Sequence, residues 1–347
     1  RGLGDVYKRQ VADCMATEGH PRLLLNEQDV QRITSQEEMT PTFAASMNRI
    51  AKRLELPLTS LPDVPQPLHA GGGYSHEQHK RNGATIHDAG MMFQLTGEQK
   101  YAELGRSLLM EYAAQYPTYG THPAATSSSP GQMFWQSLNE AMWLVSVIQG
   151  YDALYASLRD SEREAIESRL ILPMARFLSI GQPHKFNQIH NHGTWAVAAV
   201  GMTGFVLDDP ELVEIALLGL GKDGEGGFLR QINDLFSPDG YYSEGPYYHR
   251  FALMPFVVFA KAIDQNDPER KIFKYRDGVL LKAADAIIQL SYNGLFFPLN
   301  DAIKDKGLDT RELYHAASIV FGLTGDRGLL SIAQLHNGVT LNGDGYD

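Results

Sequence analysis

Apolar residues recur at helical spacing along most of this chain from His76 onward, whereas clear period-two alternation is scarce. Gly294–Pro298 is the best short strand candidate. Short, often polar links join the helical segments, which is typical of antiparallel helical hairpins and not of an α/β sheet. We therefore predict an all-α fold, an incomplete (α/α) toroid of antiparallel hairpins with about ten to twelve helices. The predicted helices include residues 86–97, 101–116, 136–155, 160–178, 191–207, 211–219, 225–236, 247–265, 277–292, 310–323 and 326–334.

The ends and links of the chain complete this picture. His20–Ile33 is predicted as a short extended piece followed by a helix that Asn26 caps. Residues 56–74 and 117–131 are predicted loops. No linker rich in Pro, Ser or charge divides the chain, so residues 11–347 are interpreted as a single (α/α) toroid domain. The first ten residues resemble adaptor-derived sequence and are set aside as non-native.

The charge balance limits the partners that we expect. Of the 347 residues, 41 are acidic and 30 basic, which gives a formal net charge of −11. Nucleic-acid binding usually needs an excess of Lys and Arg, so no nucleic-acid partner is predicted. A polyanionic substrate would need a locally basic cleft on this acidic body.

Disulfide and membrane possibilities are limited as well. The single cysteine, Cys14, excludes an intramolecular disulfide. The longest apolar stretch, Trp195–Leu207, contains two glycines and is too short to cross a bilayer, so no membrane partner is predicted. No secretory signal is visible. We nevertheless expect a periplasmic or secreted protein, and its oligomeric state stays open.

The densest polar cluster, His184–Trp195, leads into a strongly apolar helix. It contains three histidines and two asparagines, more than a helix cap requires. Two interpretations stay open at this point. Asn191 or Thr194 caps the helix and the histidines are solvated, or the cluster presents donors to an anion near a helix N-terminus.

A second cluster, Ser237–Phe251, places four tyrosines, a histidine and an arginine before the next apolar helix. One interpretation is a packed aromatic corner. The other is a tyrosine whose pKa is lowered by a neighbouring Arg or His, so that it donates or accepts a proton.

Two further clusters are less specific. His76–His79 has the sequence HExH, but no third ligand is indicated, so no metal is predicted and a basic cleft lining is preferred. In Gly131–Glu140, polar residues share one helical face that either lines the toroid cavity or is ordinary surface. No P-loop, Rossmann fingerprint or G-x-S-x-G motif is present, and no cofactor is predicted.

Two motifs carry a family resemblance. NHGTW at 191–195 and EGPYYHR at 244–250 resemble the alginate lyase and heparinase II/III superfamily of polysaccharide lyases, and oligoalginate lyases of polysaccharide lyase family 17 look most similar. HPRLLL, HKRN and GQMFWQSLNEA extend the resemblance over nearly all of residues 20–340. The family fold is a helical toroid followed by a C-terminal β-sandwich domain. We expect this chain to lack the β-sandwich domain.

The resemblance also implies a site. The family's Asn-His pair falls on Asn191 and His192, its catalytic tyrosine on Tyr248 and its substrate-binding arginine on Arg250. We expect the site residues to line one cleft, because a toroid brings the starts of its helices to one face. The further candidates for substrate binding are Gln136, Arg81 and His249.

The implied reaction is β-elimination on a uronate, in an acidic polysaccharide or oligosaccharide for which alginate is the first choice. Asn191 and His192 would neutralise the carboxylate, and Tyr248 would act as acid and base. No metal or organic cofactor is needed for these steps.

Two other functions stay open. One is a non-catalytic polyuronate-binding module, and the other is a glycoside hydrolase on the same toroid, which needs two carboxylates about 5–10 Å apart. The carboxylate candidates for a hydrolase are Asp88, Glu140, Asp239 and Glu244.

Overall fold

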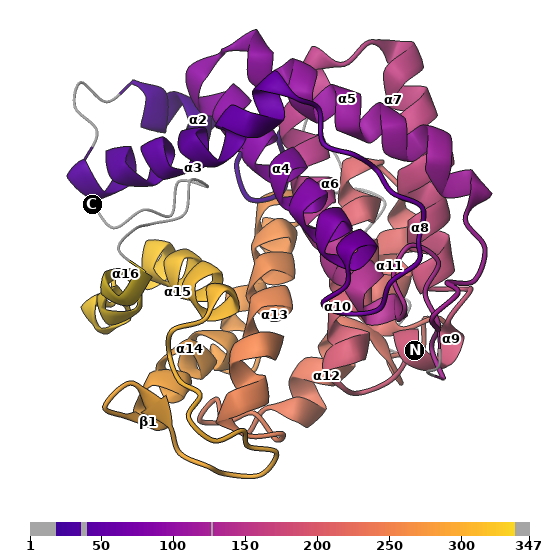
Figure 1. Cartoon of the computed structure of the whole chain (residues 1–347). Helices are drawn as coiled ribbons and strands as arrows, with labels where there is room; N and C mark the ends of the chain where they lie inside the picture. The colour runs from indigo at the N-terminus through magenta and orange to yellow at the C-terminus, as the bar shows by residue number, and fades with distance from the viewer. Residues whose placement is uncertain (1–18, 36–39, 126–127, 337–347) are drawn as a thin grey trace.

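The computed structural model describes residues 19–35, 40–125 and 128–336, and these ranges are mostly helical, as the sequence predicts (Figure 1). Within them, the only strands are β1 (Ser291–Tyr292) and β2 (Leu295–Phe296), a short antiparallel hairpin that includes part of the strand candidate. The α-helices are α2 (Glu27–Thr34), α3 (Pro41–Thr59), α4 (Tyr74–Thr96), α5 (Gln99–Gln115), α6 (Ser137–Leu154), α7 (Asp160–Ile166), α8 (Leu172–Leu178), α9 (Pro183–Phe186), α10 (Asn191–Val206), α11 (Pro210–Leu218), α12 (Gly227–Leu235), α13 (Pro246–Asn266), α14 (Val279–Gln289), α15 (Arg311–Thr324) and α16 (Leu330–His336).

An inner row of helices forms the centre of the toroid. α4, α6, α10, α13 and α15 pack against one another in chain order, while α5 and α7 lie at the periphery (Figure 1). Every residue of α10 except His192 is buried. A helix that is apolar all round belongs in a core. The sequence therefore places α10 at the centre and leaves His192 as its one side chain near the surface.

The first two inner helices, α4 and α6, run parallel and very close together. Gly83 lies against the indole of Trp143, and Gly90 lies against Gly150 further along both helices. A Cβ atom on Gly150 would lie 2.7 Å from the carbonyl oxygen of Ile86. Glycine at these positions lets the two backbones approach one another.

α10 and α13 also run parallel. The rings of Trp195 and Phe251 lie near the helix starts with centroids 5.3 Å apart, and those of Phe205 and Phe259 lie further along at 6.3 Å. Their N-terminal ends therefore lie at the same end of the toroid. These ends carry the two motifs that the sequence singles out.

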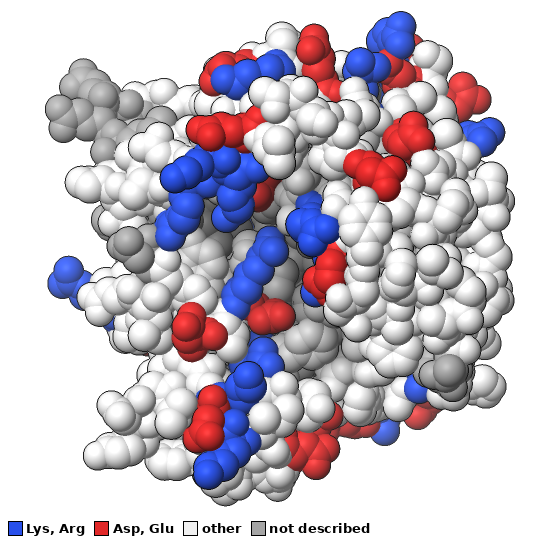
Figure 2. Space-filling view, viewed as in Figure 1, with Lys and Arg blue, Asp and Glu red and all other residues white. Residues whose placement is uncertain are grey.

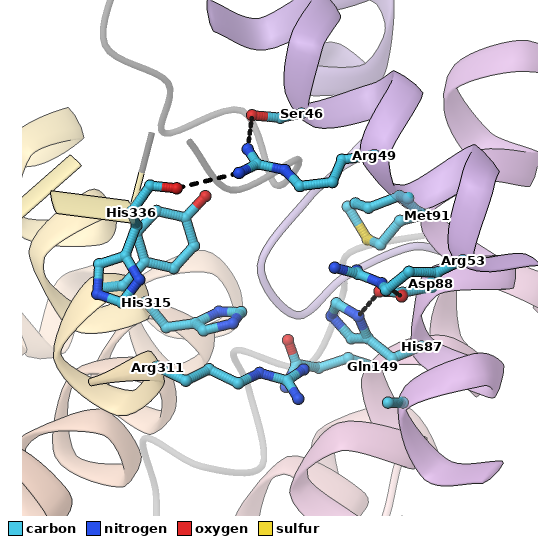
Figure 3. A pocket seen from close by; sticks show the side chains of 13 residues that line it. Ser46, Arg49, Arg53, His87, Asp88, Met91, Gln149, Arg311, His315 and His336 are labelled. Carbon is cyan, nitrogen blue, oxygen red and sulfur yellow. Dashed lines mark hydrogen bonds and ion pairs between the residues drawn. The ribbon is translucent and has the colours of Figure 1, made fainter. Parts of the chain in front are cut away.

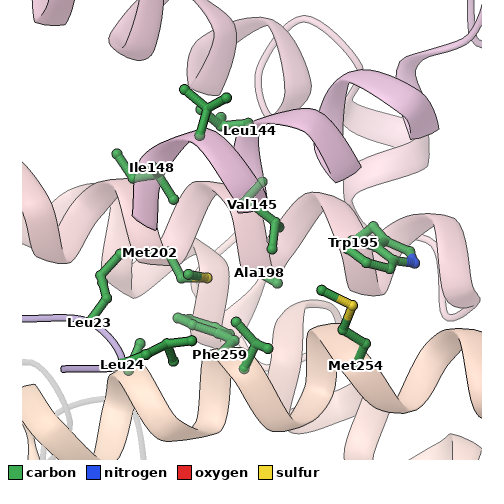
Figure 4. Close-up of a cluster of buried hydrophobic side chains, with 14 of the residues drawn as sticks. Leu23, Leu24, Leu144, Val145, Ile148, Trp195, Ala198, Met202, Met254 and Phe259 are labelled. Atoms are coloured by element: carbon green, nitrogen blue, oxygen red, sulfur yellow. The ribbon is translucent and has the colours of Figure 1, made fainter. Parts of the chain in front are cut away.

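The core lies between these inner helices (Figure 4). It includes Leu23 and Leu24 from the extended segment before α2, which contact side chains of the inner row in this cluster. Asn26 caps α2 as predicted, and it forms a capping box with Asp29. The N-terminal segment is thus held both by burial of its leucines and by a hydrogen-bonded cap.

The toroid is open between its first and last hairpins. α3 lies opposite α15 and α16, and a hollow separates them (Figures 1 and 2). Figure 2 shows Lys and Arg side chains gathered around this hollow. The guanidinium of Arg49 donates to the carbonyl oxygen of His336 across the opening at 3.0 Å. The incomplete toroid therefore has a locally basic opening on a chain whose net charge is −11.

Several predicted boundaries differ from the structure. The loop predicted at 56–74 is shorter, because α3 continues through Pro57 to Thr59. Residues 131–136, predicted as part of a helical face, are not helical, and Gln136 is the N-cap residue of α6. Residues 1–10, predicted to be non-native, lie outside the described ranges. None of the helices in those ranges has the length and apolarity that a membrane span requires.

The close approach of α4 and α6 generates a stability prediction. Gly150→Ala places a methyl group against the backbone of α4, so we expect it to lower the free energy of unfolding by about 1–3 kcal/mol. Gly120→Ala is the control, because a Cβ at Gly120 meets nothing within 4 Å. Urea unfolding followed by circular dichroism measures both. Equal stability of the two variants would contradict the close packing.

Candidate active site

The carboxylate of Glu244 joins the N-terminal ends of α10 and α13. The side-chain nitrogen of Asn191, the first residue of α10, donates to Oε1 at 3.3 Å and to Oε2 at 3.0 Å of this carboxylate. His190 Nε2 lies 3.4 Å from Oε1, and the Tyr242 hydroxyl donates to Oε2 at 3.3 Å. Burial alone would raise the pKa of the Glu244 carboxyl, but the hydrogen bonds from His190 and Asn191 outweigh it and hold that pKa below its usual range.

His192 lies in the first turn of α10 with its imidazole half-buried. Its ring is 5.1 Å from that of His190, and its ring nitrogens have no hydrogen-bond partner among the described residues. Burial lowers the pKa of His192 to about 4, and the neighbouring His190 and Lys185 add to the shift. His192 is therefore a neutral imidazole at pH 7 with both nitrogens available to a ligand.

Tyr248 lies in the first turn of α13 and is also half-buried. Its hydroxyl makes no hydrogen bond with any described residue. Burial raises the pKa of this phenol, and nearby Tyr247, Glu244 and Asp301 raise it further. The sequence-based alternative of a lowered tyrosine pKa is therefore wrong for Tyr248, which holds its proton at neutral pH and can donate it.

Arg250 lies one turn from the start of α13, and its charge is already engaged. Nη1 is 3.6 Å from a carboxylate oxygen of Glu312 on α15, and the guanidinium lies 4.5 Å from the centre of the Tyr247 ring. Nε is buried and has no hydrogen-bond partner among the described residues. Arg250 thus ties α13 to α15, and only part of its guanidinium is left to contact a substrate.

His249 lies in the core. Its side chain is fully buried between the rings of Phe236 and Tyr242, and neither ring nitrogen has a partner. Burial lowers its pKa to about 3. The structure therefore gives His249 no access to a saccharide, unlike the substrate-binding role that the sequence suggests.

The structure brings together only part of the predicted site. Arg81 is exposed on α4 and its guanidinium donates to Gln78. Gln136 precedes α6 without capping it through its side chain. Both lie near the starts of inner helices, but no hydrogen bond or ion pair joins either one to His192. Their place in a shared cleft stays a prediction.

The HExH segment is structural. His76 and His79 are both buried in the first turns of α4, and His79 Nδ1 lies 2.9 Å from the Tyr112 hydroxyl. No group of three His, Cys, Asp or Glu side chains in the described ranges is arranged to hold a metal ion. The preferred interpretation as a basic cleft lining does not fit these two histidines, because they face the core.

Two carboxylates proposed for a hydrolase have structural roles instead. Glu140 is fully buried, and its Oε1 accepts from the backbone N–H groups of Gln132 and Met133 at 2.7 and 2.5 Å. Asp88 is buried beside Arg53, whose Nη2 lies 2.7 Å from Oδ2. Glu140 is closed to a sugar, and Asp88 is the one acidic residue of the cavity that it lines, whereas glycoside hydrolysis requires two carboxylates.

Sequence reasoning missed two features. Glu244 appears there only as a hydrolase candidate and not as the link between α10 and α13. The residues that line the cavity in the opening of the toroid were not predicted either. The sequence signals of this cavity are basic residue types four positions apart, Arg49 with Arg53 and Arg311 with His315. These pairs come from opposite ends of the chain.

Comparisons with known proteins agree with this architecture. The family model described as alginate lyase matches residues 41–295. The chain belongs to the alginate lyase family. A crystal structure of an alginate lyase from Bacteroides ovatus superposes with a TM-score of 0.63 over 93% of this chain and 97% of that one. At 11% sequence identity, this similarity supports the helical toroid fold and nothing finer.

Two curated relatives are much more similar in sequence. Exo-oligoalginate lyase of Saccharophagus degradans is 56% identical over 327 residues, 94% of this chain and 44% of that protein. Alginate lyase of Stenotrophomonas maltophilia is 51% identical over 315 residues, 91% of this chain and 42% of that protein. The chain therefore spans less than half the length of the two relatives.

The surroundings of His192 generate a titration prediction. We expect its imidazole to titrate near pH 4, because burial and two neighbouring basic groups disfavour the charged form. NMR titration measures this, with His192→Ala assigning the signal. Lys185→Met removes one basic neighbour and should raise the pKa of His192. A His192 signal that titrates near pH 6.5 in the unmodified protein would contradict the burial of this imidazole.

Glu140 generates a prediction for stability against pH. Burial raises the pKa of its carboxyl from 4.5 to about 8, so the folded state keeps a proton that the unfolded state loses. Stability should therefore fall as the pH rises from 4.5 to about 8, by up to roughly 1.4 kcal/mol per pH unit. Urea unfolding across this range measures the slope. Glu140→Gln should flatten it, and an unchanged slope would show that Glu140 is ionised in the folded protein.

Proposed function

We propose that this chain forms the catalytic helical part of a lyase that cleaves uronate-containing polysaccharides or oligosaccharides, alginate first among them, by β-elimination. The observation that carries the proposal is the pair of open polar groups, the His192 imidazole and the Tyr248 hydroxyl, at the starts of two parallel helices joined by Glu244. Membership of the alginate lyase family and the names of the two relatives support the choice of substrate.

The chemistry explains why such groups are needed. The proton at C5 of a uronate lies next to a carboxylate and is barely acidic while that carboxylate is charged. A neutral imidazole at His192 can donate a hydrogen bond to the carboxylate and stabilise the negative charge that develops as the proton leaves. Asn191 is buried and its amide nitrogen donates to the Glu244 carboxylate, so it would act by holding the start of α10, and with it His192, in place.

Tyr248 is the proposed proton-transfer group. Its raised pKa keeps the phenol protonated, so it can protonate the glycosidic oxygen as the bond breaks. In a syn elimination, the proton at C5 and the leaving oxygen lie on the same face. The phenolate that forms when Tyr248 gives its proton to the glycosidic oxygen can therefore take the C5 proton, which restores the phenol while the C5–H electron pair forms the C4–C5 double bond. None of these steps requires a metal ion or an organic cofactor.

Two other functions differ from this proposal in their products. A lyase forms an unsaturated uronate that absorbs ultraviolet light. A glycoside hydrolase forms reducing ends without this absorbance, and a polyuronate-binding module forms neither product. The structural roles of Glu140 and Asp88 weigh against a hydrolase. Measuring absorbance and reducing ends together on polymannuronate and polyglucuronate separates the three.

Removal of the Tyr248 hydroxyl tests the mechanism. Tyr248→Phe keeps the ring but removes the transferable proton, so we expect turnover to fall by about 10²–10⁴-fold while calorimetric binding of oligomannuronate is nearly unchanged. Tyr247→Phe is the matched control, because Tyr247 stacks on Arg250 through its ring and should need no hydroxyl. His192→Ala should lose both turnover and affinity.

The outcome that contradicts the mechanism is equally clear. Tyr248→Phe could keep near-normal turnover while a correctly folded His249→Ala variant loses activity. This result would show that Tyr248 is not the proton-transfer group. The melting temperature of each variant checks that it folds, which matters for His249 because this side chain is fully buried.

A further inference from the structure

A cavity of about 330 Å³ with basic side chains in its lining lies in the opening of the toroid (Figure 3). Side chains of α3 and α4 line one wall, side chains of α15 and α16 line the opposite wall, and Gln149 of α6 lies at its edge. Its volume falls within the range of small-molecule sites, about 300–1,000 Å³. The cavity is separate from the Glu244 cluster in its lining residues.

The cavity has an excess of positive charge. Three guanidinium groups, those of Arg49, Arg53 and Arg311, line it, and Asp88 is its one acidic lining residue. Arg53 forms an ion pair with Asp88, its Nη2 lying 2.7 Å from Oδ2. Arg311 is exposed and makes no hydrogen bond or ion pair with any described residue. The cavity thus offers at least one guanidinium that lacks an anionic partner.

Histidines complete the polar lining. His87 Nδ1 lies 3.4 Å from Asp88, and His315 lies on α15 one turn after Arg311. Burial lowers the pKa of His315 well below its ordinary value, and the charge of Arg311 lowers it further. An imidazole N–H beside guanidinium groups can donate a hydrogen bond to an anion or to a hydroxyl group.

The cavity is connected to the candidate active site through two adjacent residues of α15. Glu312 binds Arg250, which lies two residues after Tyr248 on α13. Arg311, next to Glu312, lines the cavity. These two contacts place Arg311 near the side of Arg250 on which a saccharide bound at Tyr248 could continue.

We propose that this cavity binds the carboxylate of a second uronate residue in the same oligosaccharide, with Arg311 as its principal ligand. The inference rests on the proposed function, because it takes the chain bound at Tyr248 to be a polyuronate. An arginine fork matches a carboxylate through two parallel hydrogen bonds. The cavity would then favour longer acidic substrates over short or neutral ones.

Calorimetry in the Tyr248→Phe background tests the proposal without turnover. The ligands are oligomannuronates from dimer to hexamer, with neutral mannohexaose for comparison. Arg311→Gln should weaken binding of the longer oligomannuronates by roughly tenfold and leave the dimer unchanged, because only longer chains reach the cavity. Arg327→Gln is the matched control, since Arg327 is also exposed on the C-terminal part of the chain and does not line the cavity.

A second variant should change the binding affinity in the opposite direction. Asp88→Asn removes the partner of Arg53, so it should tighten binding of the longer oligomannuronates provided that its melting temperature shows a folded protein. Unchanged affinity in Arg311→Gln overturns the proposal. An equal loss of affinity for the dimer and the hexamer also overturns it, because Arg311 would then bind the reacting uronate. Binding of neutral mannohexaose as tight as that of the hexamannuronate overturns it as well.

The two proposals fail in different ways. If the unmodified protein produces no unsaturated uronate from any uronide, the proposed lyase function fails. The affinity difference between Arg311→Gln and Arg327→Gln is measured without turnover, so it reports on the cavity in either case.

Discussion

The hydrogen bonds around Glu244 are the interaction on which the candidate site depends. Its carboxylate accepts from Asn191 at the start of α10 and from Tyr242 just before α13, and it contacts His190. Two helix ends that are far apart in the sequence are thereby held together. The carboxylate also contributes to the raised pKa of Tyr248. One acidic side chain therefore holds the geometry of the proposed machinery, while burial is the main cause of the shifted pKa values of Tyr248 and His192.

That arrangement requires parallel inner helices. Because α10 is buried on all sides, it has one position in the fold, at the centre of the row, and His192 reaches the surface only at its N-terminal end. The aromatic pairs between α10 and α13 align the two helices, so that Tyr248 in the first turn of α13 lies at the same end as the start of α10. The outer helices complete the core but carry none of these groups. Packing in the core thus determines where the groups proposed for proton transfer lie.

Much of this could be predicted from the sequence. Helical periodicity indicated the all-α class, and polar clusters before two apolar helices marked the candidate region. The family resemblance then indicated Asn191, His192 and Tyr248 within it. Side-chain direction could not be predicted, so His249 was taken as a ligand although it faces the core. The cavity was missed because residues of the first and last hairpins line it together. Arg49 and Arg53 lie near α15 only because the chain curves into a toroid.

A crystal structure of the Tyr248→Phe variant with an oligomannuronate tests the central claim most directly. The account predicts a uronate carboxylate within hydrogen-bonding distance of the His192 imidazole, with the glycosidic oxygen facing the ring at position 248. A saccharide bound elsewhere, with no contact to His192, would contradict the assignment of the active site to the starts of α10 and α13.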